Sequence, residues 1–188
     1  MRWKNLTITG MSITLAALLL VPSAALADAR ANLKGVQEVP SVSTDASGKF
    51  RVKLIRNEDA MEFKLLYSGF ETFVRFAHIH FAQRHVNGGI VVWLCDNTGN
   101  SPTPVDPCPQ GSGRVEGVIT ADDVSGAPAQ GIDPGEFFEV VEAINAGAAY
   151  VNVHSDAVPS GEIRGQIRGR LGDRDDDDDD RKRHHEDG

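Results

Sequence analysis

The sequence predicts an all-β fold, an antiparallel Greek-key β-sandwich or barrel that carries one short helix. Short segments in which apolar and polar residues alternate with period two recur along the chain, which is typical of half-buried strands. Gly, Pro and Asn residues separate these segments. A helical period occurs in a single segment, so the pattern favours an antiparallel sandwich or barrel over an alternation of strands and helices.

The alternation is clearest in two neighbouring segments, KFRVKL at 49–54 and MEFKLLY at 61–67. Asn57, Glu58 and Asp59 lie between them and predict a hairpin turn. The other predicted strands are 30–35, 74–81, 90–95, 113–119, 149–154 and 162–168.

One segment follows the helical period. Phe137, Val140, Val141 and Ile144 recur at i, i+3, i+4 and i+7, and Gly147 follows them. We expect a short helix that covers one end of the sheets.

The N-terminus has the pattern of a secretory signal. Arg2 and Lys4 precede the apolar run ITLAALLLV at 13–21, and Ala25-Leu26-Ala27 is a small-x-small cleavage pattern. The run is shorter than the roughly 20 residues that span a bilayer. We therefore expect residues 1–27 to be removed, and a secreted chain, periplasmic or extracellular, with no membrane span after cleavage.

The remaining chain is acidic. Residues 28–188 hold 27 acidic and 17 basic residues, which argues against a nucleic-acid partner. Much of this charge lies in residues 173–188, which we expect to be a disordered acidic tail because they offer nothing apolar to bury. His184 and His185 in this tail are expected to be solvated. Residues 28–172 are long enough for one domain with its own core.

Cys95 and Cys108 are the two cysteines of the chain. In an oxidising compartment such a pair is expected to form a disulfide, and the CxxC spacing of many metal sites is absent. Closing a loop of this length stabilises a fold by roughly 3 kcal/mol.

The stretch AHIHFAQRH at 77–85 contains three of the six histidines. Residues two apart on a strand point to the same face, so His78 and His80 stand side by side. In YVNVHS at 150–155, His154 has the matching parity if the valines face the core. The three imidazoles are then expected to meet on the outer side of the sheet, beneath the loops at 82–89 and 156–161.

Three imidazoles at one point suit copper or zinc, with copper the higher in the affinity series. His85, in the adjoining loop, is a candidate fourth ligand. The alternative interpretation is that the histidines are structural and hydrogen-bond to nearby backbone. Trp93 is interpreted as a packing residue.

Four ordered motifs carry a resemblance to a known family: LKGVQEVPSVSTDASG at 33–48, FAHIHFAQRHVNGGIVVWL at 76–94, AINAGAAYVNVHS at 143–155 and PSGEIRGQI at 159–167. They resemble the CHRD domain, named after chordin, over roughly residues 30–169. The resemblance implies an all-β extracellular domain whose biochemical role is mostly unassigned. Its hallmark positions correspond to His78, His80, Asn87, Gly88, Asn152, His154, Gly161, Glu162, Arg164, Gly165 and Gln166.

A looser similarity links the chain to the copper-zinc superoxide dismutase sandwich, which also uses an H-x-H pair, a later histidine and an arginine beside the metal. Arg164 is the candidate anion-attracting residue, with an ion pair to Glu162 as the alternative. Counterparts of that family's bridging histidine and zinc-ligating aspartate are not evident. No catalytic residue is assigned.

The leading hypothesis is an exported protein that binds a transition metal, copper before zinc, at a surface cluster of His78, His80 and His154 with His85. The alternatives are a cell-envelope interaction module with structural histidines and no assigned protein partner, and a copper enzyme that consumes superoxide.

Overall fold

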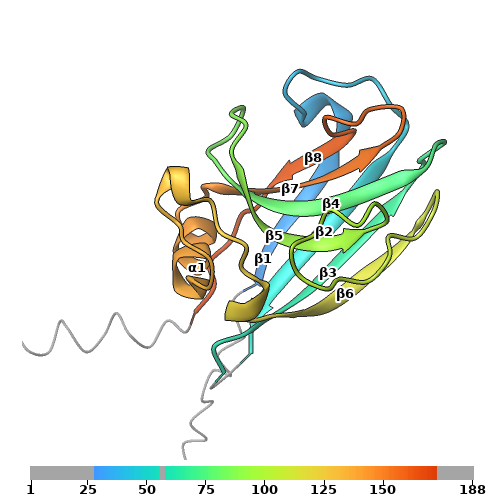
Figure 1. The fold of residues 1–188 in the computed structure, drawn as a ribbon. Helices are drawn as coiled ribbons and strands as arrows, with labels where there is room; N and C mark the ends of the chain where they lie inside the picture. Colours follow the sequence, from blue (N-terminus) through green and yellow to red (C-terminus); the bar gives the residue numbers. More distant parts are fainter. Residues whose placement is uncertain (1–27, 56–57, 173–188) are drawn as a thin grey trace, which may run out of the picture.

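The computed structural model describes residues 28–55 and 58–172 (Figure 1). The predicted signal segment and the predicted acidic tail lie outside the described residues. The described residues form eight strands, and the sequence predicted each of them. Their bounds are β1 Asp28–Lys34, β2 Ser47–Leu54, β3 Met61–Ser68, β4 Val74–Phe81, β5 Gly89–Asp96, β6 Gly113–Ile119, β7 Ala149–Ser155 and β8 Ile163–Gln166.

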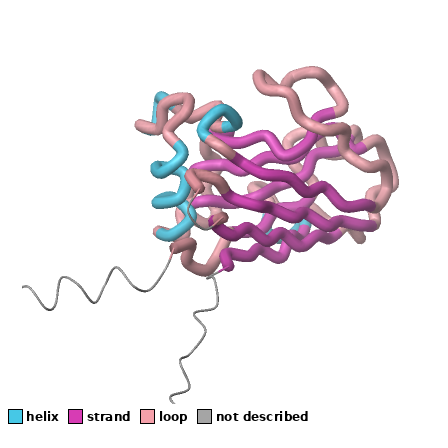
Figure 2. The backbone as a smooth tube through the Cα atoms, turned by 90° about the horizontal axis from the view of Figure 1, so that it is seen from below, coloured by secondary structure: helices cyan, strands magenta, loops and turns pink. Residues whose placement is uncertain are grey.

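All strand pairs are antiparallel, and the strands form one sheet in the order β5-β4-β7-β8-β1-β2-β3-β6. The two end strands, β5 and β6, also contact each other, so the sheet curls into a nearly closed barrel or sandwich. Figure 2 shows the strands lying side by side with their axes roughly aligned along this barrel. The predicted all-β fold is confirmed.

Alternation in β2 and β3 places one face of each strand in the core. Met61, Phe63, Leu65 and Tyr67 are buried, whereas the residues between them are exposed or half-buried. Phe50 lies opposite Leu65 in the pairing register. Each such apolar side chain stabilises the fold by about 1.5 to 3 kcal/mol on burial.

Strands β4 and β7 break this pattern because both of their faces are covered. All seven residues of β7 are buried, and so are the four residues at 77–80 of β4. One face contributes Ala77, Ile79, Val151 and Val153 to the hydrophobic core. The other face carries the polar side chains of the candidate site, and loops cover it.

Helix α1, Phe137–Asn145, matches the predicted helix and lies at one end of the strands (Figures 1 and 2). Its buried residues, which include Val140 and Ile144, belong to the hydrophobic core. Gly147 follows with a φ of 67°, a left-handed conformation that glycine adopts at little cost. Three short 3₁₀ helices were not predicted: η1 Gly35–Gln37, η2 Ala121–Asp123 and η3 Pro128–Gln130. Among the described helices, none is both long and apolar enough to span a membrane.

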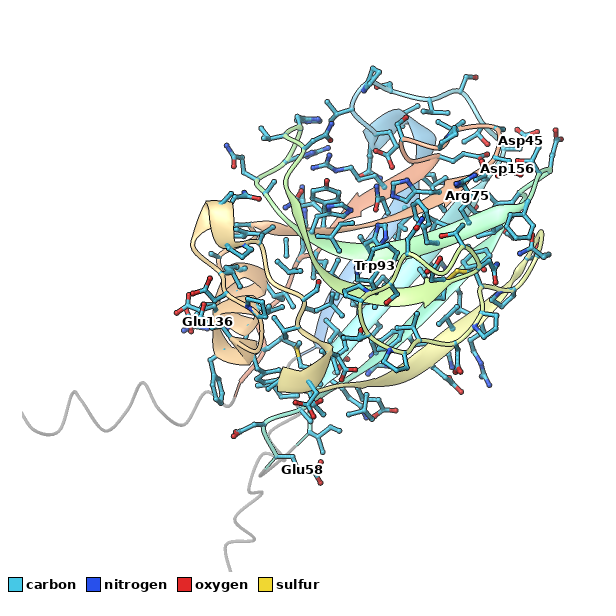
Figure 3. The ribbon with its side chains drawn as sticks, in the orientation of Figure 1. Asp45, Glu58, Arg75, Trp93, Glu136 and Asp156 are labelled. Carbon is cyan, nitrogen blue, oxygen red and sulfur yellow. A yellow bond between two sulfur atoms is a disulfide. The ribbon has the colours of Figure 1, made fainter. Side chains whose placement is uncertain are left out.

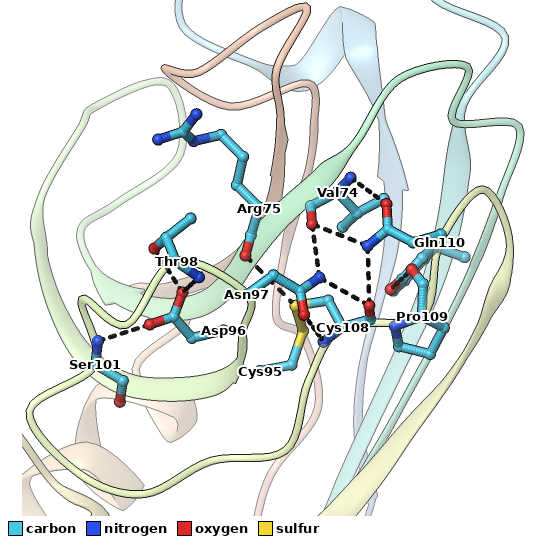
Figure 4. Close-up of a disulfide and its surroundings, with 11 residues drawn as sticks. Val74, Arg75, Cys95, Asp96, Asn97, Thr98, Ser101, Cys108, Pro109 and Gln110 are labelled. Atoms are coloured by element: carbon cyan, nitrogen blue, oxygen red, sulfur yellow. Dashed lines mark hydrogen bonds between the residues drawn. A yellow bond between two sulfur atoms is a disulfide. The ribbon is translucent and has the colours of Figure 1, made fainter.

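The predicted disulfide between Cys95 and Cys108 is confirmed (Figure 4). It joins β5 to the long connection that leads to β6. The Asn97 side chain supports this connection, since its amide donates to the carbonyls of Val74 and Cys108, each at 2.8 Å. The disulfide therefore lies within a hydrogen-bonded loop anchored to the start of β4.

Candidate metal centre

The pairing of β4 with β7 brings the three predicted histidines together. His78 lies opposite Asn152, and Phe76 lies opposite His154, so the side chains of His78, His80 and His154 share one face. One ring nitrogen from each histidine lies within 4.8 Å of the other two. Two segments that are about 70 residues apart in sequence thus supply one cluster, through the strand parity that the sequence predicted.

The cluster is not on the surface, and this part of the prediction is wrong. The exposed fractions are 1% for His78 and 7% for both His80 and His154. The two loops predicted to lie above the cluster close over it instead of leaving it open. His80 Nδ1 lies 2.9 Å from the carbonyl oxygen of Gly88, and His154 Nδ1 lies 2.9 Å from that of Pro159.

Aromatic rings form the walls of the cluster. The Trp93 and Phe76 rings lie 4.1 Å and 4.8 Å from the His78 ring, measured between centroids. Phe76 also packs 4.6 Å from His154, and Tyr150 stacks on His80 at 4.6 Å with nearly parallel planes. Trp93 lies on β5 (Figure 3) and packs against the ring of His78, so it is a packing residue whose neighbour is a candidate metal ligand.

Register shifts between β4 and β5 bring Trp93 to this position. His78 pairs with Trp93 and Ile79 pairs with Val92, but Ala77 pairs with Cys95 and His80 with Ile90. One extra β5 residue is therefore accommodated on each side of the central pairs, as in β-bulges. Such irregularities re-aim side chains, and here they leave Trp93 against the His78 ring.

Hydrogen bonds to the covering loops fix which ring nitrogen of His154 is free. The neutral ring donates its Nδ1–H to the Pro159 carbonyl, so Nε2 carries the lone pair, and Nε2 is buried with no partner. Both ring nitrogens of His78 are also buried without a partner. Buried unpaired polar atoms are costly, and these nitrogens could hold a ligand.

His80 differs from the other two histidines. Its Nδ1–H donates to Gly88, and its Nε2 lies 3.0 Å from Oδ1 of Asn152. A neutral ring has one N–H, so it can donate to only one of these two oxygens. With Nδ1–H on Gly88, the Nε2 lone pair faces the Asn152 amide. A metal ion would have to displace this amide from Nε2.

All three rings are in the neutral form that binds metals. Burial lowers the pKa of His78 to about 2 and the pKa values of His80 and His154 to about 4. The charges of the neighbouring histidines lower the pKa of His78 further, whereas the bonds to Gly88 and Pro159 act in the opposite direction on His80 and His154. At neutral pH no proton competes for the free nitrogens.

His85, the candidate fourth ligand, is not part of this group. It is exposed at the tip of the loop at 82–89, with a left-handed φ of 64°. Asn and His are among the side chains that tolerate this conformation best, so the sequence signal at this position is one of turn formation.

Arg164 does not form the ion pair with Glu162 that was the alternative interpretation of this residue. Its guanidinium lies 3.4 Å from the centre of the Tyr150 ring and donates to Val86 O and Asn87 Oδ1, which fastens the 82–89 loop. Glu162 instead accepts hydrogen bonds from Thr44 and Ser155. Arg164 is only 2% exposed, and its role as an anion-attracting residue stays a prediction.

Glu38 is a site residue that sequence reasoning missed. It is 5% exposed, and burial raises its pKa to about 7, although the Arg164 charge and a hydrogen bond from Asn152 act in the opposite direction. It comes from the loop after η1, where no periodicity indicates direction. Phe76 and Tyr150 carried a usable signal, because they share the parity of the histidines on their strands.

Comparison with known proteins agrees with the fold and the motifs. The family model described as CHRD domain matches residues 29–167. No curated protein and no solved structure matches the chain, so the similarity to superoxide dismutase is not confirmed. The matched segment includes all eight strands except for the first residue of β1, and it contains the three clustered histidines. The chain therefore belongs to the CHRD domain family.

Proposed function

We propose that this protein is an exported metal-binding protein, with a transition-metal ion held by His78, His80 and His154. The observation that carries the proposal is the set of buried ring nitrogens without partners, two on His78 and one on His154. A structural histidine normally has its ring nitrogens paired when it is buried. An ion bound between these rings would satisfy Nε2 of His154 and one nitrogen of His78.

The outer hydrogen bonds support the same proposal. Metal-binding histidines usually donate the second ring N–H to a carbonyl or carboxylate, which orients the ring and makes the ligand more basic. His80 and His154 each do so, to Gly88 and Pro159. The two covering loops would thus act as supports for the ligands.

The fit requires a small contraction. Three nitrogens bound to one ion at about 2.0 Å lie roughly 3.5 Å apart. The present separations reach at most 4.8 Å. Ring rotations that move the nitrogens by about an ångström, together with displacement of the Asn152 amide, would complete the site. Copper is our first choice, with zinc as the alternative, because imidazole is a suitable ligand for both metals.

Export is supported by the predicted signal segment and by the disulfide, which is typical of oxidising compartments. Catalytic consumption of superoxide would be an activity additional to metal binding. Superoxide consumption would have to be measured on the copper-loaded protein, against copper-loaded protein in which His78 is replaced.

Metal titration tests the proposal directly. The full chain carrying His184→Ala and His185→Ala, which removes competing tail histidines, is titrated with Cu(I), Cu(II) and Zn(II). We expect one ion per chain, lost in His78→Leu and His154→Leu and retained in His85→Ala, the exposed control. Deleting residues 170–188 would also remove the tail histidines, but it would remove Leu171, which is buried and whose backbone bonds to the Asn145 side chain. Equal weak binding of every ion in all four proteins would contradict the proposal. It would favour the alternative, an interaction module with structural histidines.

A further inference from the structure

The cluster supplies donors but no negative charge. Each imidazole binds as a neutral ligand, and no carboxylate or thiolate joins the three histidines in the group that the described residues form. Structural zinc sites are almost always four-coordinate, and Cu(II) prefers a tetragonal arrangement of four or more donors. Three neutral donors meet either preference only when water or another ligand fills the remaining position, as in three-histidine zinc sites.

Burial makes the charge of the ion decisive. The three rings are at most 7% exposed, and Phe76, Trp93 and Tyr150 surround them. The cost of moving an ion from water into such surroundings rises with the square of its charge, and no anionic ligand offsets that cost here. A singly charged ion is therefore disfavoured far less than a doubly charged ion.

A fixed positive charge lies beside the cluster. The buried guanidinium of Arg164 stacks on Tyr150, whose ring stacks on His80. Glu38 is a buried carboxyl group whose Oε1 lies, with Nδ2 of Asn152, against Gly161, and its charge and that of Arg164 affect each other's pKa. These two groups act on a bound ion with opposite signs.

We propose that the cluster is a cuprous site, which binds Cu(I) in preference to Cu(II) and Zn(II), with Arg164 as the residue that increases this preference. This inference rests on the proposed metal-binding function. Cu(I) and Zn(II) both have a filled d shell that imposes no geometry, so their charge and coordination number separate them here. Three neutral nitrogen donors are sufficient for the singly charged ion. The surrounding aromatic rings also exclude the water ligands that Cu(II) and Zn(II) would need.

The test compares dissociation constants for three ions. The full chain with His184→Ala and His185→Ala is titrated without oxygen against a coloured Cu(I) chelator, with ascorbate as the reductant, and separately against chelators of Cu(II) and Zn(II). We expect Cu(I) to bind more tightly than Cu(II) by about 100-fold or more. X-ray absorption of the Cu(I) protein should show three nitrogen neighbours.

Charge variants separate electrostatics from loop support. Arg164→Gln removes the charge, and Arg164→Lys keeps it while losing the forked hydrogen bonds to Val86 and Asn87. We expect the ratio of Cu(II) to Cu(I) dissociation constants to fall about tenfold in Arg164→Gln and to remain near the parent value in Arg164→Lys. Glu38→Gln should raise the same ratio.

The two hypotheses fail in different ways. Binding of Cu(II) or Zn(II) that depends on His78 and is as tight as that of Cu(I) would overturn the cuprous site and retain the metal centre. Equal ratios in the two Arg164 variants would overturn the role of the charge. Absence of any binding that depends on His78 or His154 would overturn both proposals.

Discussion

The two faces of the β4–β7 pair are equally buried and chemically opposite. Toward the core, Ile79, Val151 and Val153 are fully buried among apolar side chains. On the other face, His78, His80 and His154 are almost as inaccessible but retain three ring nitrogens with no partner. Burial therefore does not distinguish core from site in this molecule.

The satisfaction of polar groups does distinguish them. Packing of the inner face stabilises the fold by excluding water from carbon atoms. The outer face removes polar atoms from water without replacing every hydrogen bond, which costs stability. The proposed metal-binding function accounts for this difference, and replacements on the two faces should therefore have opposite effects on stability and binding.

The largest effect is expected on the inner face. Ile79→Ala should lower the free energy of unfolding by about 4 kcal/mol, because a fully buried side chain leaves a cavity. The metal dissociation constant of the folded variant should not change. Urea unfolding and metal titration of the same preparation measure both, with Ile79→Val as the milder control. Loss of metal affinity at full foldedness would show that the two faces are coupled.

Acidification should act on the outer face. The folded pKa of His78 lies near 2 and those of His80 and His154 lie near 4, all below the unfolded value near 6.5, so the unfolded chain binds more protons on acidification. Their contribution to stability is complete above pH 6.5 and is lost as the pH falls through the folded values. Glu38 acts oppositely, since its folded pKa is raised to about 7 and its contribution is lost as the pH rises through that value.

For metal-free protein, urea unfolding between pH 7 and pH 5 should show a net loss of about 3 kcal/mol. Glu38→Gln removes the opposing contribution and should steepen the loss. A stability that is constant over this range in both proteins would mean that the rings are not held neutral by burial.

Period-two alternation predicted the strands because the face to which each side chain points is set by its position along the strand. Residues 61–67 alternate in sequence and in burial alike. The parity argument that joined His154 to His78 and His80 also needed nothing beyond strand geometry. The disulfide could be predicted from the presence of one cysteine pair.

The burial of the histidines could not be predicted in this way. It depends on the loops that carry Gly88, Pro159 and Glu38, and the path of a loop is set by tertiary contacts that no periodicity records. Arg164 illustrates the point, because parity placed it beside Glu162 whereas the structure bonds it to Val86 and Asn87 of a distant loop.

The disulfide region offers a further contrast with the histidine face. Replacing both cysteines, Cys95→Ala with Cys108→Ala, should lower the free energy of unfolding by about 3 kcal/mol through the entropy of the opened loop. Since neither cysteine belongs to the histidine cluster, metal affinity should stay at the parent value. Calorimetry of the metal-free and metal-loaded forms would show this, and a change in affinity would mean that the loop anchored by Asn97 helps to position β4.

The smallest effect has the sign that most sharply separates the two faces. His78→Leu removes two buried nitrogens that have no partner, and we expect the metal-free protein to gain about 1 kcal/mol in unfolding free energy. His80→Leu is the matched control on the same strand and face, because it breaks the bond to Gly88 and should destabilise the protein by a similar amount. Both variants should lose the metal, so a common loss of binding would accompany opposite changes in stability. Equal destabilisation by the two replacements would show instead that His78 stabilises the metal-free fold.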